Sequence, residues 1–140
     1  MGGKIAFAAA VAVAACGAAP DQTVQGHFTI CREQRQPDCV VDGDTIQVDD
    51  VRIQLSDIDA PDTWRPSCEA QREMGERAAR RLAQLLNAGP FQLESHEARD
   101  HDGYGRELRV AVRGGRSLGD VLMQEGLARP WRGAREDWCR

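Results

Sequence analysis

Short runs of alternating apolar and polar residues dominate the chain from residue 27 to residue 55, a pattern typical of half-buried β-strands. In one run Val51, Ile53 and Leu55 alternate with polar residues, so one face is predicted to lie in the core and the other to be polar. Asp49-Asp50, just before this run, is a tight-turn sequence. The pattern predicts a β-meander, with strands at 27–31, 38–41, 44–48 and 51–55.

The period of the apolar positions becomes helical between Cys68 and Leu86. Gly89-Pro90 follows and is expected to end this helix. The apolar positions that share one helical face are Met74, Ala78, Leu82, Leu85 and Leu86.

Two more strands and a second helix are expected in the last third of the chain, the strands at 91–96 and 107–112. Ser117 and Asp120 have the spacing of a capping box that opens the helix, and Gly126 suits its end. Residues 128–140 show little regular pattern. This order of elements, in 140 residues, predicts one α+β domain built around a small β-barrel.

The N-terminal residues 1–15 are expected to be a signal peptide, because Lys4 precedes an uncharged apolar run that is too short to span a bilayer. The run ends at Val13-Ala14-Ala15-Cys16, which resembles a bacterial lipobox, so Cys16 is the expected lipidation site. Cleavage at an Ala-rich site without lipidation is the alternative. We expect residues 16–26 to be a flexible tether and residues 27–140 to form the domain of a cell-envelope, periplasmic or extracellular protein.

Cysteine usage also indicates export. With Cys16 set aside, four of the five cysteines remain, an even number in a small domain. Three pairings are possible, and we favour Cys31–Cys39, which closes a short loop, with Cys68–Cys139, which ties residue 139 to the middle of the chain. A zinc site is not expected, because C-x-x-C is absent and the histidines lack ligand spacing with the cysteines.

The formal net charge of −4 excludes binding of nucleic acid through bulk positive charge. Any contact with a polyanion must rest on a local cluster of cations. Lys4 is the only lysine among 18 basic residues, so arginine supplies the positive charge of the domain. Arginine suits bidentate binding of phosphate, although a GC-rich genome produces the same bias.

Acidic residues gather in Val41-Asp42-Gly43-Asp44-Thr45 and again between Asp57 and Asp62, on expected strand ends and turns. Carboxylates on separate segments can converge on one hard cation such as Ca²⁺. Taken alone, Asp-Gly is more often a hairpin turn, and the EF-hand pattern is absent. Further along, Asp102-Gly103-Tyr104-Gly105-Arg106 places an arginine on a glycine-rich turn.

Four motifs in order, V-D-G-D-T, D-A-P-D, D-G-Y-G-R and E-G-L-A, resemble those of the staphylococcal-nuclease-like (thermonuclease) family between about Cys39 and Trp131. The resemblance implies a five-stranded Greek-key barrel of the OB-fold type with two to three helices. It also implies a Ca²⁺-dependent phosphodiesterase that acts on single-stranded DNA and RNA. We expect the protein to be a monomer.

By this resemblance Asp44 and Asp59 match the metal carboxylates and the Ala60 carbonyl matches a backbone metal ligand. Asp42 matches a supporting acid of the metal site, and Arg106 matches the phosphate-binding arginine. The metal and the arginine would gather charge on the phosphorane oxygens, while a carboxylate positions or deprotonates the attacking water.

Two departures from the family pattern bear on catalysis. Asp62 stands where the family usually has glutamate, which withdraws the carboxylate by about 1 Å. Gln54 stands where the family usually has arginine, and one lost transition-state donor typically costs about 3–4 kcal/mol. Arg52, two residues earlier on the same strand face, either reaches toward the same phosphate or only hydrates an exposed face.

Two aromatic residues are candidates for substrate binding. Tyr104 either stacks on a base or sugar or packs against the barrel, and Trp131 is a stacking platform or a packing residue. Three functions follow: an exported nuclease, weakened by Gln54 and Asp62; a nucleic-acid-binding or interaction module without efficient catalysis; and a structural lipoprotein domain. Retention of the metal acids and Arg106 favours the first over the third.

Overall fold

The computed structural model describes residues 21–32, 36–96 and 100–140. The expected signal peptide and the lipidation site Cys16 lie outside these residues. No helix within the described ranges combines the length and the apolar character that a membrane crossing requires.

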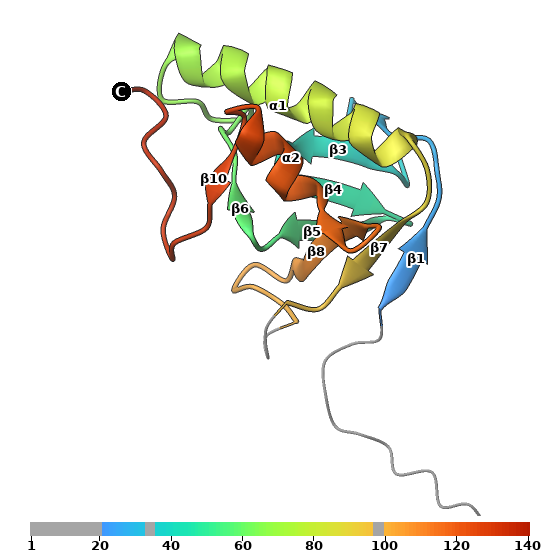
Figure 1. Ribbon diagram of the computed structural model, residues 1–140. Helices are drawn as coiled ribbons and strands as arrows, with labels where there is room; N and C mark the ends of the chain where they lie inside the picture. Colours follow the sequence, from blue (N-terminus) through green and yellow to red (C-terminus); the bar gives the residue numbers. More distant parts are fainter. Residues whose placement is uncertain (1–20, 33–35, 97–99) are drawn as a thin grey trace, which may run out of the picture.

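A curled, mixed sheet forms the body of the protein, with eight strands among the described residues (Figure 1). Its order is β1-β7-β8-β5-β4-β3-β2, and β9 pairs with β8. The antiparallel pairs β3–β4 and β4–β5 form the predicted meander, and β5 lies parallel to β8. The strands are β1 (Gln22–Val24), β2 (Thr29–Ile30), β3 (Cys39–Asp42), β4 (Thr45–Val48), β5 (Val51–Leu55), β7 (Phe91–Glu94), β8 (Glu107–Arg113) and β9 (Arg116–Ser117).

The turn between β4 and β5 is the predicted tight hairpin. Asp49 and Asp50 have φ values of 48° and 67°, the left-handed conformation that a two-residue type I′ turn requires. Val48 therefore pairs directly with Val51. In β5, Ile53 and Leu55 are buried as predicted, whereas Val51 is exposed at the start of the strand.

The prediction of a flexible tether at residues 16–26 was wrong for its second half. Residues 22–24 form β1, which pairs antiparallel with β7 and buries Val24. Three residues are too few to show a period, and the strand forms because the edge of β7 offers it backbone partners. β2 also departs from the meander, since it joins β3 in parallel.

Two helices lie among the described residues, α1 (Glu69–Asn87) and α2 (Leu118–Gln124). α1 runs along β2 and β3, and α2 lies beside it (Figure 1). The buried face of α1 consists mainly of small residues, so the helix approaches the sheet closely, while Met74 and Leu85 are only half-buried. Ser117 caps α2 as predicted by accepting a hydrogen bond from the Gly119 N–H, at 3.0 Å.

The core lies between the inner face of the sheet and the two helices. Phe28 and Phe91 pack there with ring centroids 5.8 Å apart. Residues that are fully buried in this core include Val40, Ile46, Ile53, Leu55, Ile58, Leu82, Leu86, Leu93 and Leu122. These α+β elements on a curled sheet confirm the OB-type fold.

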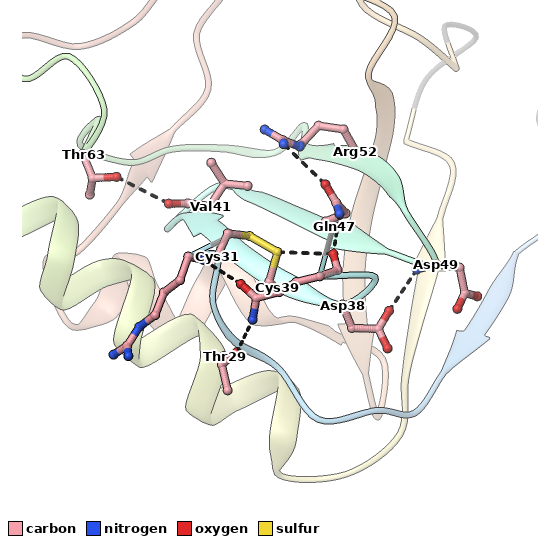
Figure 2. Close-up of a disulfide and its surroundings, with 11 residues drawn as sticks. Thr29, Cys31, Asp38, Cys39, Val41, Gln47, Asp49, Arg52 and Thr63 are labelled. Carbon is pink, nitrogen blue, oxygen red and sulfur yellow. Dashed lines mark hydrogen bonds between the residues drawn. A yellow bond between two sulfur atoms is a disulfide. The ribbon is translucent and has the colours of Figure 1, made fainter. Parts of the chain in front are cut away.

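The four cysteines form the two disulfides favoured from the sequence. Cys31–Cys39 joins the end of β2 to the start of β3 across a Cα–Cα distance of 5.0 Å (Figure 2). Nearby, Asp38 accepts a hydrogen bond from the Asp49 N–H at 2.9 Å, which ties the β4–β5 turn to this loop (Figure 2). Cys68–Cys139 ties the start of α1 to the segment 131–140, called the tail segment below.

Removal of the second disulfide is expected to destabilise the protein more than removal of the first. Chain entropy gives about 4.5 kcal/mol for Cys68–Cys139, whose residues are 71 apart, and about 2.5 kcal/mol for Cys31–Cys39, whose residues are 8 apart. Urea unfolding of the two double alanine variants, each compared with wild type, measures both losses. Equal losses, or a larger loss for the Cys31–Cys39 pair, would contradict the entropic account.

Candidate functional site

Most of the polar residues expected to act together line one cleft of about 290 Å³. Asp44 comes from the turn after β3 and Gln54 from β5. Asp59 comes from β6 (Ile58–Asp59), which pairs with β10 (Arg129–Pro130) in a separate two-stranded sheet. Arg106 comes from the loop before β8. The tail segment adds Trp131, Gly133 and Arg135 to the same cleft.

Asp44 is held by the tight packing of its turn. A Cβ atom at Gly43 would lie only 2.7 Å from the Ala78 Cβ and 3.0 Å from the Ala60 Cβ, so the hairpin can approach α1 only with glycine there. The Asp44 carboxylate accepts hydrogen bonds from the Ala60 N–H at 2.9 Å and the Thr45 hydroxyl at 3.0 Å. Asp44 is 2% exposed, so its charge is almost fully removed from water.

Burial raises the pKa of Asp44 to about 6. The Ala60 N–H partly offsets this effect, whereas the neighbouring acids Asp42 and Asp59 raise the pKa further. Burial also raises the pKa of Asp42, whose carboxylate accepts from the Thr63 N–H at 3.0 Å. The strongest feature of this region is therefore a buried negative charge surrounded by other acids.

Asp59 is bound from a part of the chain far away in sequence. Its Oδ2 atom accepts hydrogen bonds from the Glu136 N–H and from the Trp138 indole N–H, both at 2.9 Å. The tail segment leaves β10 and returns beside the start of α1, which brings these donors to β6 (Figure 1). Residues 128–140 show no periodicity, so no local sequence pattern indicated this contact. Trp138, which is buried, was not among the predicted site residues.

The residues present fit a hard divalent cation. Asp44 and Asp59 are each 2% exposed and line the same cleft, and the charge of Asp59 contributes to the raised pKa of Asp44. The hydrogen bonds to Asp59 recorded within the described residues all go to Oδ2, which leaves Oδ1 for a ligand. The described residues contain no cluster of three His, Cys, Asp or Glu side chains suited to a metal. Backbone carbonyls such as that of Ala60, water and phosphate would supply the other oxygens.

Arg106 is oriented before any ligand arrives. Its Nε donates to Asp102 Oδ2 at 2.5 Å, and its Nη1 donates to Gln54 Oε1 at 2.8 Å. The Thr45 hydroxyl lies 3.0 Å from both Gln54 Oε1 and Asp44 Oδ1, and its single proton can be donated to either oxygen. Gln54 thus positions Arg106 instead of adding a charge of its own, and the remaining guanidinium N–H groups are available to an anion.

Two of the acids expected at the site do not line the cleft. Asp42 faces Thr63. Asp62 accepts from the Trp64 N–H at 2.8 Å and the Arg65 N–H at 3.3 Å, and it forms an ion pair with Arg135 at 3.7 Å. Asp62 therefore closes its own turn.

An open pocket of about 660 Å³ adjoins the cleft and shares Arg106 and Arg135 with it. Arg52 lines this second pocket and donates to Gln47 at 3.3 Å, so it does not reach the first. Tyr104 also lines it and is 89% exposed, which rules out packing against the barrel; the Arg106 guanidinium lies over its ring, 5.7 Å from the centroid. Trp131 is 46% exposed at the cleft.

The stability of the metal-free protein is expected to fall as the pH rises from about 4 to about 6. The pKa of Asp44 is raised from 3.8 to about 6, so the folded state holds a proton that the unfolded chain releases, and this stabilisation is lost above the folded-state pKa. The loss amounts to about 3 kcal/mol. Urea unfolding in a chelator measures it as the difference between wild type and Asp44→Asn. A difference that does not change with pH would contradict the shift.

Comparison with known proteins places this geometry in a family. The family model described as Staphylococcal nuclease homologue matches residues 52–137. The SPbeta prophage-derived endonuclease YokF of Bacillus subtilis (strain 168) is 42% identical over 98 residues, covering 66% of this chain and 32% of YokF. Endonuclease YncB of the same strain is 40% identical over 98 residues, covering 66% of this chain and 45% of YncB.

The micrococcal nuclease of Shigella flexneri is 34% identical over 106 residues, covering 66% of this chain and 55% of that enzyme. The chain thus spans between about a third and just over half of the length of these relatives. The family model covers more than half of the chain, and Asp44, Asp59 and Arg106 of this chain line one cleft. This protein therefore belongs to the staphylococcal nuclease homologue family.

Proposed function

We propose that this protein is a nuclease that hydrolyses phosphodiester bonds of single-stranded DNA and RNA with Ca²⁺ as its cofactor. The observation that carries the proposal is the cleft in which Asp44 and Asp59, both almost fully buried, lie with Arg106. Three relatives are named as nucleases or endonucleases, which supports the same reaction class.

In this mechanism Asp44 and Asp59 would hold the cation, and the Ala60 carbonyl would be a third ligand. Bound Ca²⁺ would supply positive charge to the scissile phosphate and lower the pKa of an attacking water. Arg106 donates to the non-bridging phosphate oxygens, and its orientation by Asp102 and Gln54 makes these donors complementary to the charge of the transition state. The exposed ring of Tyr104 and the indole of Trp131 are suited to stacking on unpaired bases.

A second candidate function is a nucleic-acid-binding or interaction module with little catalysis. The position of Asp62 favours it, because this carboxylate is occupied by the Trp64 and Arg65 N–H groups and does not line the cleft. Activation of water would then depend on another base or on the cation alone.

Incubation of the purified protein with denatured DNA and with RNA, in Ca²⁺ or in chelator, separates the two functions. The nuclease proposal expects cleavage in Ca²⁺ and none in chelator. Binding that is insensitive to chelator, without cleavage in any divalent cation, would refute the nuclease and support the binding module. Size-exclusion chromatography of the same sample tests the expected monomer.

We further propose that the protein is exported and anchored through a lipid on Cys16. Two disulfides in a small domain support an oxidising compartment. Metabolic labelling with a radioactive fatty acid is expected to mark the wild type and not Cys16→Ala. Equal labelling of both, or of neither, argues against lipidation at Cys16, and cell fractionation tests export separately.

A further inference from the structure

Arg135 is a second cation of the cleft, and it comes from a part of the chain with no regular sequence pattern. It lines both the cleft and the adjoining open pocket, as Arg106 does. The two arginines approach from different segments, one before β8 and one from the tail segment. Because both arginines line both pockets, the surface between the two pockets is continuous at these residues.

The backbone at Arg135 is fixed relative to the buried acids. The next residue, Glu136, donates its N–H to Asp59 at 2.9 Å, and Trp138 adds a second hydrogen bond to the same oxygen. The disulfide at Cys139 closes the tail segment against α1. The backbone of Arg135 is thus adjacent to a residue that is held by a hydrogen bond. Little backbone entropy is therefore lost when the Arg135 side chain binds a ligand.

The side chain of Arg135 keeps donors for a ligand. It is 53% exposed, and the recorded contact with Asp62 is an ion pair at 3.7 Å, longer than a hydrogen bond. A guanidinium has five N–H donors in a fork that matches phosphate oxygens. Asp62 therefore holds the charge near the cleft without using its donors.

The charge balance of the cleft shows why this cation matters. Asp44, Asp59 and Asp102 line the cleft together with Arg106 and Arg135. The whole protein carries a net charge of −4, so a polyanion gains nothing from the average field and depends on these local charges. Gln54 also lines the cleft, where it accepts a hydrogen bond from Arg106 and contributes no charge.

We propose that Arg135 binds a phosphate of the nucleic-acid strand, next to the phosphate bound by Arg106. The inference rests on the proposed function in that it takes nucleic acid as the ligand. It assigns a binding role to the tail segment, which becomes part of the substrate site as well as a clamp on Asp59.

The test is binding of a short fluorescent oligothymidylate to the full protein in chelator, where no cleavage is expected, over a range of salt concentrations. Arg135→Gln is expected to weaken binding about tenfold at low salt and to reduce the slope of log affinity against log salt by about one phosphate contact. Arg135→Lys keeps the charge and is expected to keep the slope. The matched control is Arg132→Gln, an exposed arginine of the same segment outside both pockets, which is expected to change neither quantity.

Asp62→Asn separates phosphate binding from a structural ion pair. Loss of the Asp62 charge frees Arg135, so affinity is expected to stay equal or to rise. If Asp62→Asn weakens binding as much as Arg135→Gln, or if Arg135→Gln leaves affinity and slope unchanged, the inference is wrong. An Arg135-dependent slope without any cleavage in Ca²⁺ would uphold the inference while the nuclease proposal fails.

Discussion

Asp44→Asn is expected to abolish Ca²⁺-dependent cleavage, with a loss of at least about a thousandfold, while the metal-free protein becomes more stable near neutral pH. The two effects have one cause. Asp44 is 2% exposed and its pKa is raised by burial, so in the absence of a cation its ionised form destabilises the fold. The same buried negative charge would attract and bind a divalent cation.

The substituted amide fits the hydrogen bonds of the site. Its oxygen can accept from the Ala60 N–H, and its NH₂ can donate to the Thr45 hydroxyl, which then donates to Gln54. The variant should therefore fold, and its loss of activity should not arise from misfolding. Asp49→Asn removes the same charge from an exposed turn with positive φ, where asparagine is well tolerated, and serves as the matched control.

Ca²⁺ is the second variable in this experiment. It should raise the unfolding free energy of the wild type by about 2.7 kcal/mol at a concentration of one hundred times its Kd, and it should leave Asp44→Asn unchanged. Urea unfolding with and without Ca²⁺ measures both values, and a nuclease assay measures the rates. Retained cleavage, or an equal response of both proteins to Ca²⁺, would remove Asp44 from the metal site.

Arg106→Gln is expected to lower the cleavage rate by about 10²–10³-fold with a smaller effect on the KM. The guanidinium is oriented by Asp102 and Gln54 before substrate arrives, so its donors meet transition-state charge without reorganisation. Glutamine keeps one amide donor and loses the charge.

Arg116→Gln is the control for Arg106→Gln, because Arg116 is exposed on β9 and lies outside both pockets. Steady-state kinetics on a defined single-stranded oligonucleotide separates the rate from the KM. An effect on the KM alone would make Arg106 a binding residue that does not distinguish the transition state from the substrate.

The elements with a clear period were predictable from the sequence. The alternation at 51–55, the Asp49-Asp50 turn and the long amphipathic helix correspond to β5, its hairpin and α1. β6 and β10 could not be predicted, because each has two residues and their backbone partners are far away in sequence. β9 is also only two residues long, too short to show a period, and it pairs with the end of β8 across a tight turn.

The candidate site divides in a similar way. Asp44, Asp59 and Arg106 occur in short motifs on turns, and the fold brings them to one cleft. Arg135 and Trp138 could not be found from local sequence, because their role depends on the return of the tail segment. Gln54 was predicted only as a missing charge, whereas the structure shows an acceptor that orients Arg106.

The bonds between Asp59 and the tail segment also set the order in which the site can assemble. They join residues 77 and 79 positions apart, while the hairpins of the sheet close over a few residues. In the chain with Cys68–Cys139 reduced, contacts of such long sequence separation pay a larger loop-closure entropy, so they form after local structure. In refolding experiments that start from the reduced chain, the circular dichroism signal of the sheet is therefore expected to return before the fluorescence signal of buried Trp138. Cleavage activity is expected to return no earlier than the Trp138 signal.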